Sequence, residues 1–582
     1  MRRLGLLVVC VAVLAAACTG NGDGSTSTAP PDTSASTSLP PAGSTSTTAP
    51  KGLPDGFGGS ISIGLETPVA TLNPFAPNNS HGRLAGNAVW ATVFDIDPET
   101  WERIPDTVTT LPSEAGGIEV NEDGTMTVRY ELRSDARWSD GVAISGADLA
   151  FTAEAMRDMA LSGSGGVDPV MATVTATDSV EQIAFITFAE PTLAFEDALW
   201  IVLPSHSLAG ADLLGGTDGS DWPSGGPFIV DEFDSTSHLV LVRNEFYWKT
   251  DARGESLPYL DGLSFEKTSA TGSFGQEPIS PVGPFLAGER DVISVPNSTD
   301  EISRIESSDA EDAVLETTAT PIVETMVFQF GSGRDVANPE SNNDSSSYRT
   351  AVAYALDRAA LLAETGVPWI PDTPGLLIPI GPSAWDQYPY DVETGSVLVE
   401  QSSPDGGAQS VLSTTGNGDY RIRIGDALAT RFADISVEYE PVYLDSVVFF
   451  GEVLSGGTFD IGMWAWVSDG GYSGTLSLLR TLDPSSVPPD GNYARWGESG
   501  LSDSAQRFAA IVDTAESTLD PVEFDELVAE AEGILADLAI TIPMFQRANR
   551  VAYWESIVTG VTANGSQSDF TWNVETWQRV GE

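Results

Sequence analysis

The chain has few of the residues that form disulfides, build Cys/His metal sites or contact nucleic acid. Its 582 residues include two cysteines and three histidines, so a disulfide framework or a Cys/His zinc site has almost no residues to build on. Only 27 lysines and arginines oppose 84 aspartates and glutamates, which gives a formal charge of −57. Because duplex binding requires basic side chains that neutralise phosphates, this composition excludes a generic nucleic-acid-binding protein.

Signatures of common enzymes are also missing from the sequence. None of the three lysines, Lys51, Lys249 and Lys267, follows a glycine, which excludes a P-loop. The sequence has no Gly-x-Ser-x-Gly nucleophile elbow, and no dinucleotide fingerprint follows a strand pattern. A pair of catalytic carboxylates, as in glycosidases, stays open because acidic residues are abundant. We therefore expect no enzymatic activity, no cofactor and no bound metal.

The first 18 residues read as a secretion signal. Met1–Arg3 is basic, Leu4–Ala17 is almost wholly apolar, and this run of about 14 residues is shorter than the ~20 that span a bilayer. Small residues at Ala15–Ala17 directly before Cys18 resemble a bacterial lipoprotein cleavage box. We expect residues 1–17 to be removed and Cys18 to be lipidated. An ordinary signal peptide followed by a chance cysteine is the alternative.

Residues 18–55 have the composition of a disordered tether. Between positions 19 and 50, 15 of 32 residues are Ser or Thr and five are Pro, and none is aromatic. Such a segment cannot bury enough apolar surface to fold. As a random coil it would extend about 30 Å. We expect an extracytoplasmic protein anchored by lipid to the outer face of the cytoplasmic membrane.

The remaining chain alternates strand and helix patterns, which predicts a mixed α/β body. Strand patterns occupy Ser60–Gly64, Met126–Leu132, Ile183–Phe188 and His238–Arg243. Helix patterns begin at Ser145 and at Asp520 with capping residues, and cover Tyr348–Thr365 and Ser502–Ser517.

A series of short motifs, in a fixed order, carries a family resemblance. They are Thr71–Pro74 (Thr-Leu-Asn-Pro), Leu132–Gly141 (ending Trp-Ser-Asp-Gly), Ser224–Phe228, Val242–Trp248, Leu286–Asp291, Tyr348–Arg358 and Ile542–Phe545. With them the chain resembles, over nearly all of residues 58–553, the extracytoplasmic solute-binding proteins of oligopeptide and dipeptide ABC importers, that is, bacterial solute-binding protein family 5 of the lipoprotein type. For most motif residues, including Trp138, we expect a structural role in packing or turns.

The resemblance implies an α/β, two-lobed, periplasmic-binding-protein-like fold of the Venus flytrap kind, cluster C type. Lobe I would contain residues 56–290 and 535–582, with an extra subdomain at about 95–200, and lobe II residues 291–534. It further implies a monomer that captures oligopeptides or dipeptides between its lobes and delivers them to ABC transporter permease subunits. Alternatives are a non-peptide solute, such as a sugar, opine or metal chelate, and a sensor or adhesin role.

The resemblance also implies a ligand site near residue 469. In the peptide-binding family a Gly-Trp-x-x-Asp segment supplies the acid that pairs with the peptide α-ammonium, and Asp469 matches that acid, three residues after Trp466. Trp464 and Trp466 share one face of the expected strand, and Tyr472 follows in a glycine-rich loop at 470–474. The loop departs from the family's Asp-Tyr-x-Asp-Pro continuation. For a ligand carboxylate, the sequence leaves three candidates open: Arg421, Arg423 and Arg431.

Overall fold

A computed structural model describes residues 57–76, 80–113, 116–163, 166–215, 217–268, 280–371, 375–377, 383–416, 419–468, 470–489, 491–497 and 502–581. The expected signal peptide (1–17), the lipidated Cys18 and the tether (18–55) lie outside these ranges, as does Asp469. Within the described part of the chain, every helix is too short or too polar to cross a membrane.

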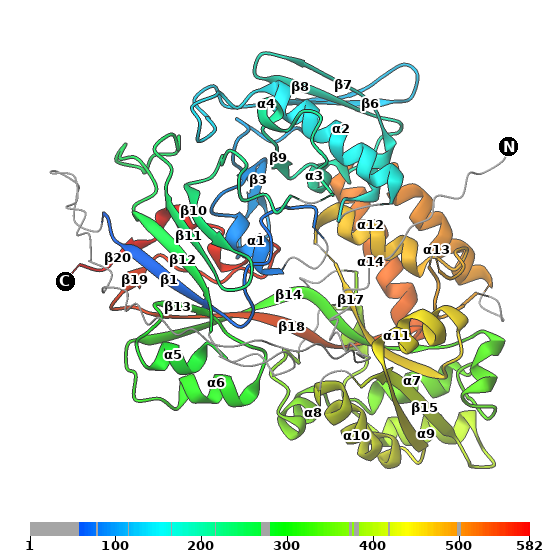
Figure 1. Cartoon of the computed structure of the whole chain (residues 1–582). Coiled ribbons are helices and arrows are strands. Elements are labelled where there is room, and N and C mark those ends of the chain that lie inside the picture. The colour runs from blue at the N-terminus through cyan, green and yellow to red at the C-terminus, as the bar shows by residue number, and fades with distance from the viewer. Residues whose placement is uncertain are drawn as a thin grey trace, which may run out of the picture.

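One large mixed sheet runs through the whole molecule (Figure 1). Its order is β10-β11-β12-β1-β13-β18-β14-β17-β15-β16, with bounds Phe228–Asp234, His238–Arg243, Gly262–Lys267, Ser60–Leu65, Val292–Ser294, Thr541–Trp554, Ala313–Phe328, Ile461–Val467, Gln409–Thr415 and Glu438–Leu444. Strands β1 and β10–β13 form the first lobe's part of the sheet and β15–β17 form the second lobe's part.

Two long antiparallel strands, β14 and β18, connect the lobes. The far end of β18 pairs with β13 in the first lobe, whereas the end of β14 pairs with β17 in the second. Their mutual pairing runs from Ala313 opposite Trp554 to Val327 opposite Thr541, with an irregularity between Ala319 and Val323. The lobes therefore share a two-stranded connection, as the predicted two-lobed α/β fold requires.

A smaller sheet, at the top of Figure 1, lies beside the first lobe. Its order is β5-β6-β8-β7, with bounds Ile118–Val120, Met126–Glu131, Ile183–Phe188 and Val174–Val180. Helix α2 (Gly146–Ser162) packs on it and begins where the sequence predicts, since the Asp148 carboxylate accepts the Ser145 backbone N–H at 2.9 Å. Trp138 is 1% exposed and donates to the same carboxylate, so its expected packing role is confirmed.

Shorter elements complete the first lobe. They are α1 (Ser80–Gly86), β2 (Ala91–Thr92), β3 (Phe94–Ile96), β4 (Arg103–Pro105), α3 (Phe195–Ala198), β9 (Ile201–Val202), α4 (Ser205–Leu208), α5 (Val282–Leu286), α6 (Thr299–Glu306), β19 (Val558–Thr559) and β20 (Gln578–Arg579). Strands β3 and β4 form a hairpin.

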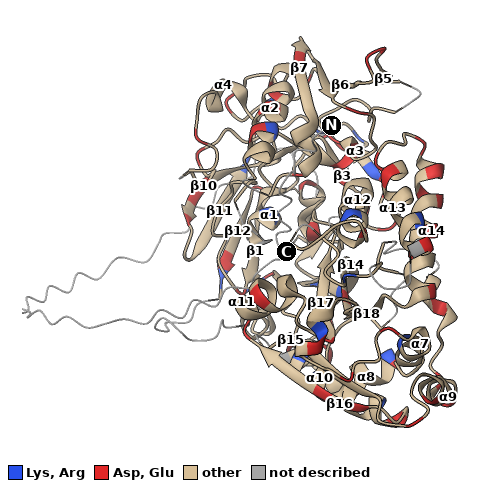
Figure 2. Ribbon diagram, turned by 90° about the vertical axis from the view of Figure 1, so that its right-hand side faces the viewer, with Lys and Arg blue, Asp and Glu red and all other residues tan. Residues whose placement is uncertain are grey.

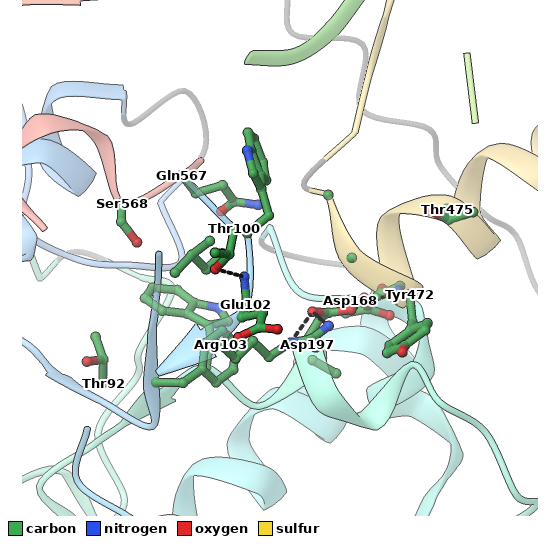
Figure 3. A pocket seen from close by; sticks show the side chains of 18 of the residues that line it. Thr92, Thr100, Glu102, Arg103, Asp168, Asp197, Tyr472, Thr475, Gln567 and Ser568 are labelled. Atoms are coloured by element: carbon green, nitrogen blue, oxygen red, sulfur yellow. Dashed lines mark hydrogen bonds and ion pairs between the residues drawn. The ribbon is translucent and has the colours of Figure 1, made fainter. Parts of the chain in front are cut away.

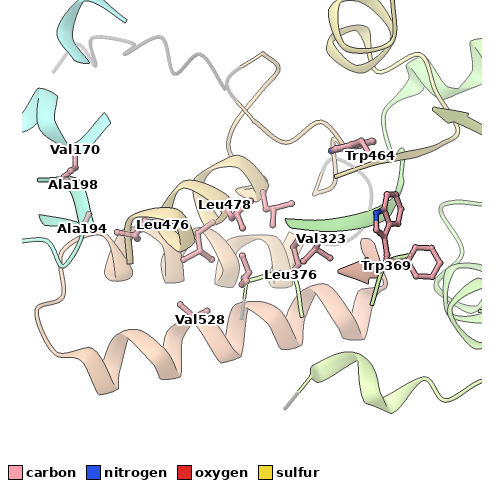
Figure 4. Close-up of a cluster of buried hydrophobic side chains, with 14 of the residues drawn as sticks. Val170, Ala194, Ala198, Val323, Trp369, Leu376, Trp464, Leu476, Leu478 and Val528 are labelled. Carbon is pink, nitrogen blue, oxygen red and sulfur yellow. The ribbon is translucent and has the colours of Figure 1, made fainter. Parts of the chain in front are cut away.

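The second lobe is mostly helical around its strands. Its helices are α7 (Ser346–Tyr354), α8 (Arg358–Thr365), α9 (Val392–Ser402), α10 (Asp419–Asp434), α11 (Ser446–Val448), α12 (Gly471–Leu482), α13 (Ser502–Ala515) and α14 (Pro521–Leu538). Figure 4 shows one buried apolar cluster that extends from Ala198 through Leu476 of α12 and Val528 of α14 to Trp464. Acidic residues recur along α13 and α14 (Figure 2), and most of them are exposed, so they add to the negative surface charge.

Two helix predictions need correction. The single helix expected over Tyr348–Thr365 is two helices, α7 and α8, because the Asp357 carboxylate caps a new helix by accepting the Ala360 N–H at 2.9 Å. The glycine-rich loop expected at 470–474 is instead the start of α12, which begins at Gly471. Gly470 and Gly471 adopt positive φ, so these glycines supply the turn into a helix rather than a longer loop.

Candidate functional site

A cavity of about 550 Å³ lies between the two lobes. The first lobe contributes the β3–β4 hairpin, α1 and α3, and the second contributes the start of α12 and part of α14. The principal lining residues are Arg83, Trp90, Phe94, Thr100, Trp101, Glu102, Arg103, Asp168, Asp197, Trp200, Gly470, Gly471, Tyr472, Ser473, Phe524, Asp525, Gln567 and Ser568. Figure 3 shows the side chains from both lobes projecting toward this space.

An arginine with two carboxylate partners forms the polar base of the cavity. Arg103 of β4 donates through Nε to Asp197 Oδ1 at 2.8 Å and through Nη1 to Glu196 Oε2 at 2.9 Å. Burial works against the Arg103 charge, but the two carboxylates outweigh it and raise the pKa of Arg103. Burial also raises the pKa of Glu196. The arrangement holds one guanidinium and two acids in a partly buried group whose formal charge is −1.

The same group joins the first lobe to the second. The backbone N–H of Ser473, in the first turn of α12, donates to Asp197 Oδ2 at 2.9 Å. The Tyr472 ring lies 5.3 Å from the Arg103 guanidinium carbon, within the range of a cation–π contact. We call Arg103, Asp197, Gly471, Tyr472 and Ser473 the interlobe clasp. Its partners come from opposite sides of the cavity, so these contacts exist only while the lobes are together.

Gly471 is the residue that permits the clasp to form. A Cβ atom at this position would lie 2.4 Å from Asp197 Oδ1 and 2.6 Å from Oδ2, far inside normal contact. Its φ of 66° is also a conformation that side chains disfavour. The absence of a side chain therefore lets the Asp197 carboxylate reach the helix N-terminus, where backbone N–H groups and the helix dipole favour negative charge.

Aromatic side chains form much of the first lobe's wall. The rings of Trp90 and Trp200 meet edge to face with centroids 5.6 Å apart, and the Arg83 guanidinium carbon lies 4.9 Å from the Trp200 ring centroid. Trp90 also donates to the Leu72 carbonyl at 2.9 Å, which fixes its orientation. Phe524 of α14 contributes an aromatic side chain from the second lobe. The cavity thus combines broad apolar surfaces with a few polar groups, as small-molecule sites do.

The predicted ligand residues occupy different surroundings. Tyr472 lines the cavity and takes part in the clasp, and burial raises the pKa of its hydroxyl to about 12. Trp464 is 2% exposed and packs against Phe449 and Phe459, and Trp466 is half-buried with its ring 5.5 Å from that of Trp464. Neither tryptophan is among the residues that line the cavity. Strand β17 thus directs both indoles into side-chain packing.

The three candidate arginines all have protein partners away from the cavity. Arg421 pairs with the buried Glu324, Arg423 donates to the Thr365 carbonyl at 2.6 Å, and Arg431 pairs with Glu364 at 2.8 Å. Sequence reasoning missed Arg103, Asp197 and Trp101, which do line the cavity. The turn sequence Asp-Pro-Glu-Thr at 97–100 could have marked the hairpin that carries two of them.

The protein has two α/β lobes, a cavity between them and contacts that join the lobes beside the cavity. This arrangement is typical of the class of binding proteins that enclose a small solute. Residues 104–485 match the family model of bacterial extracellular solute-binding proteins, family 5 (middle region), and the chain belongs to this family. The predicted family and fold are therefore confirmed. Members are extracytoplasmic binding proteins that pair with membrane permease components of ABC importers.

The individual relatives have low sequence identity to this chain but match most of its length. The oligopeptide-binding protein OppA of Mycobacterium tuberculosis (strain ATCC 25618 / H37Rv) is 23% identical over 540 residues, which cover 86% of this chain and 83% of OppA. The substrate-binding protein CtaP from Listeria monocytogenes has a TM-score of 0.69 at 17% identity, covering 90% of this chain and all of CtaP. The periplasmic EDTA-binding protein EppA has a TM-score of 0.68 at 19% identity, covering 91% and 98%.

Proposed function

We propose that this chain captures oligopeptides or dipeptides in the interlobe cavity and delivers them to an ABC importer. The observation that carries the proposal is a cavity of about 550 Å³ whose walls come from both lobes and whose edges are joined by the clasp. Its volume falls within the roughly 300–1,000 Å³ range of small-molecule sites. The long similarity to OppA supports peptides as the ligand class.

The charges of the cavity also suit a peptide. Among the residues that the structure describes, four acidic residues, Glu102, Asp168, Asp197 and Asp525, line it together with two basic residues, Arg83 and Arg103. An excess of acid complements a ligand ammonium group, which needs a carboxylate partner once it leaves water. Asp469 remains our proposed partner for the α-ammonium, since it directly precedes the cavity residue Gly470 in the chain.

Calorimetric titration with short peptides tests this proposal. We expect Asp469→Asn to weaken binding of a free-amine peptide far more than binding of the same peptide with an acetylated N-terminus. Asp405→Asn, at an exposed turn position, is a matched control that should change neither affinity. Equal losses for both peptides would remove the ammonium role of Asp469, and no heat with any peptide would refute the peptide proposal.

Ligand capture would act through closure of the lobes. A solute can favour the closed form only by the difference between its affinities for the closed and open forms. We propose the shared strands β14 and β18 as the pivot, and the start of β14, rather than residue 291, as the point where the first lobe ends, because β13 pairs with β1. Small-angle scattering should show a smaller radius of gyration with peptide. An unchanged radius together with capture of a protein partner would favour a sensor or adhesin.

A second candidate is the same scaffold with a non-peptide solute. The specific observation in its favour is the aromatic wall of Trp90, Trp101 and Trp200, because flat rings suit sugars and chelates as well as peptide side chains. The likeness in fold to a periplasmic EDTA-binding protein also supports a non-peptide ligand. Heat with a sugar or chelate, in the absence of heat with peptides, would select this candidate.

The lipid anchor is the remaining part of the proposal. We infer that Cys18 is the lipidated first residue of the mature protein and that residues 18–55 tether the body to the membrane. The expected result is that the wild-type protein fractionates with membranes, whereas Cys18→Ser is released as a soluble protein. Membrane association that is unchanged in Cys18→Ser would contradict the anchor.

A further inference from the structure

The tip of the β3–β4 hairpin holds a large side chain in an unfavourable backbone conformation. Trp101 has a φ of 62°, in the left-handed region that residues other than glycine seldom adopt. For a bulky residue this conformation is costly, and such strain persists only where the surrounding structure enforces it. The position would suit Gly or Asn better, so the indole itself needs an explanation.

Hydrogen bonds within the tip enforce this conformation. Trp101 donates its backbone N–H to the Asp97 carbonyl at 2.9 Å, and Asp97 donates its own N–H to the Glu102 carbonyl at 2.9 Å. The Asp97 carboxylate accepts the N–H groups of Glu99 and Thr100 at 2.9 and 2.8 Å. These two bonds lower the pKa of Asp97, so the carboxylate stays ionised and keeps accepting them. These bonds hold the backbone of the tip in this conformation and so fix the direction in which the Trp101 side chain leaves it.

The Trp101 indole reaches across the cavity toward the second lobe. It lines the cavity, and its ring lies 3.5 Å from where a Cβ atom on Gly470 would stand. Gly470 is the N-cap residue of α12 and carries no side chain, so the second lobe presents bare backbone at this point. Arg103 of the clasp follows two residues later, and Figure 3 shows it close to Thr100 and Glu102 of the same tip.

The surroundings of Trp101 differ from those of the other tryptophans in the cavity. Trp90 and Trp200 pair with each other, and Trp200 also contacts Arg83. Among the residues that the structure describes, no aromatic ring or cation is paired with the Trp101 ring. A rigid, half-buried indole at the cavity wall without such a partner is suited to contact a ligand.

We propose that Trp101 is the specificity-determining residue of this cavity and that it stacks on a flat apolar group of the ligand. For the peptides of the proposed function, on which this inference rests, that group is an aromatic side chain. The strained tip then has a function, since it holds the indole rigidly before the ligand arrives and so reduces the entropy lost on binding. The backbone at Gly470 forms the opposite wall of the pocket for the ligand's aromatic ring once the lobes meet.

The test compares two tripeptides, Ala-Phe-Ala and Ala-Ala-Ala, by calorimetry with the full chain. We expect the wild-type chain to bind the phenylalanine peptide about tenfold more tightly, as an aromatic pair and its buried area allow. Trp101→Ala and Trp101→Gly should remove this preference while changing the affinity for Ala-Ala-Ala much less. Trp101→Phe should keep part of it. Trp222→Ala, a half-buried tryptophan outside the cavity, should leave the preference intact.

Melting temperatures of the Trp101 variants distinguish a ligand contact from a structural role of the Trp101 side chain. Trp101→Ala keeps the left-handed strain and Trp101→Gly relieves it, so the glycine variant should melt at a higher temperature although both lose the preference. Phenyl and methyl glucosides provide a second ligand pair. A preference for phenyl glucoside that depends on Trp101, without peptide binding, would refute the peptide function and support the inference. Peptide binding without an aromatic preference would refute the inference alone, and binding of neither pair would refute both.

Discussion

Replacing Gly471 with alanine is the sharpest perturbation of the interlobe clasp. The added Cβ would meet Asp197 Oδ1 at 2.4 Å, so the carboxylate must move away from the Ser473 N–H or the lobes must separate. Either change breaks a hydrogen bond to a charged acceptor, which contributes about 1.5–3 kcal/mol. The left-handed φ of 66° adds about 1 kcal/mol of strain for any residue with a Cβ.

The chain offers a closely matched control. Gly163, at the end of α2, has a φ of 65°, and a Cβ there would meet no atom within 4 Å. Gly163→Ala therefore carries the backbone strain without the clash. The difference in ligand-binding free energy between Gly471→Ala and Gly163→Ala therefore measures the contribution of the Asp197 contact. We expect it to correspond to a loss of about 10- to 100-fold in affinity for an enclosed ligand.

Calorimetry with a bound peptide and thermal unfolding without ligand together measure this effect. Opening of the lobes relieves the clash, so we expect similar unliganded melting temperatures for Gly471→Ala and Gly163→Ala. Ligand affinity should fall only in Gly471→Ala, and scattering should show a less closed liganded form. If both variants bind ligand equally well, the clasp does not stabilise the closed form and our interpretation of Asp197 is wrong.

Two further predictions concern acidic residues inside the fold, Asp95 and Glu324. Asp95 lies near Lys249, Asp106 and Glu575, and burial together with the Asp106 charge raises its pKa to about 8. The folded carboxyl keeps a proton that the unfolded chain releases near pH 4, so from pH 4 to 8 wild-type stability should fall relative to Asp95→Asn in urea denaturation. Glu324→Gln should destabilise the fold by about 3–5 kcal/mol, because it removes the charge partner of a buried arginine.

Each of these predictions has an outcome that would contradict it. A stability difference between wild type and Asp95→Asn that stays constant with pH would show that Asp95 titrates normally in the fold. For Glu324 the control is Glu530→Gln, which breaks the exposed pair with Arg507 and should destabilise the fold much less than Glu324→Gln. Similar costs for the two substitutions would mean that the buried pair contributes no more than a surface pair.

Sequence patterns predicted those helices and strands whose positions are determined by alternating apolar residues or by capping residues. Strand β6 alternates apolar and polar residues, and α14 begins with Asp520 as its cap and Pro521 in its first turn, so both could be placed from the sequence. The break between α7 and α8 was missed because the apolar spacing continues through Asp357. The capping role of that residue became visible only once its carboxylate could be seen to accept a backbone N–H.

The clasp could not be predicted in the same way. Arg103 and Asp197 lie 94 positions apart, on a three-residue strand and a four-residue helix that have no periodic pattern of their own. Their contact with Ser473 depends on how two lobes meet, which no local signal encodes. Tyr472 was identified through the family resemblance, and the structure adds that α12 and α14, rather than strand β17, supply the second lobe's wall.

The central claim, that this protein encloses a peptide between its lobes, is tested most directly by native mass spectrometry of the protein purified from its own source. We predict a bound fraction whose added masses form a series of short peptides, released on denaturation and identified by fragmentation. A single uniform adduct with the mass and fragments of a sugar or a metal chelate would contradict the peptide claim.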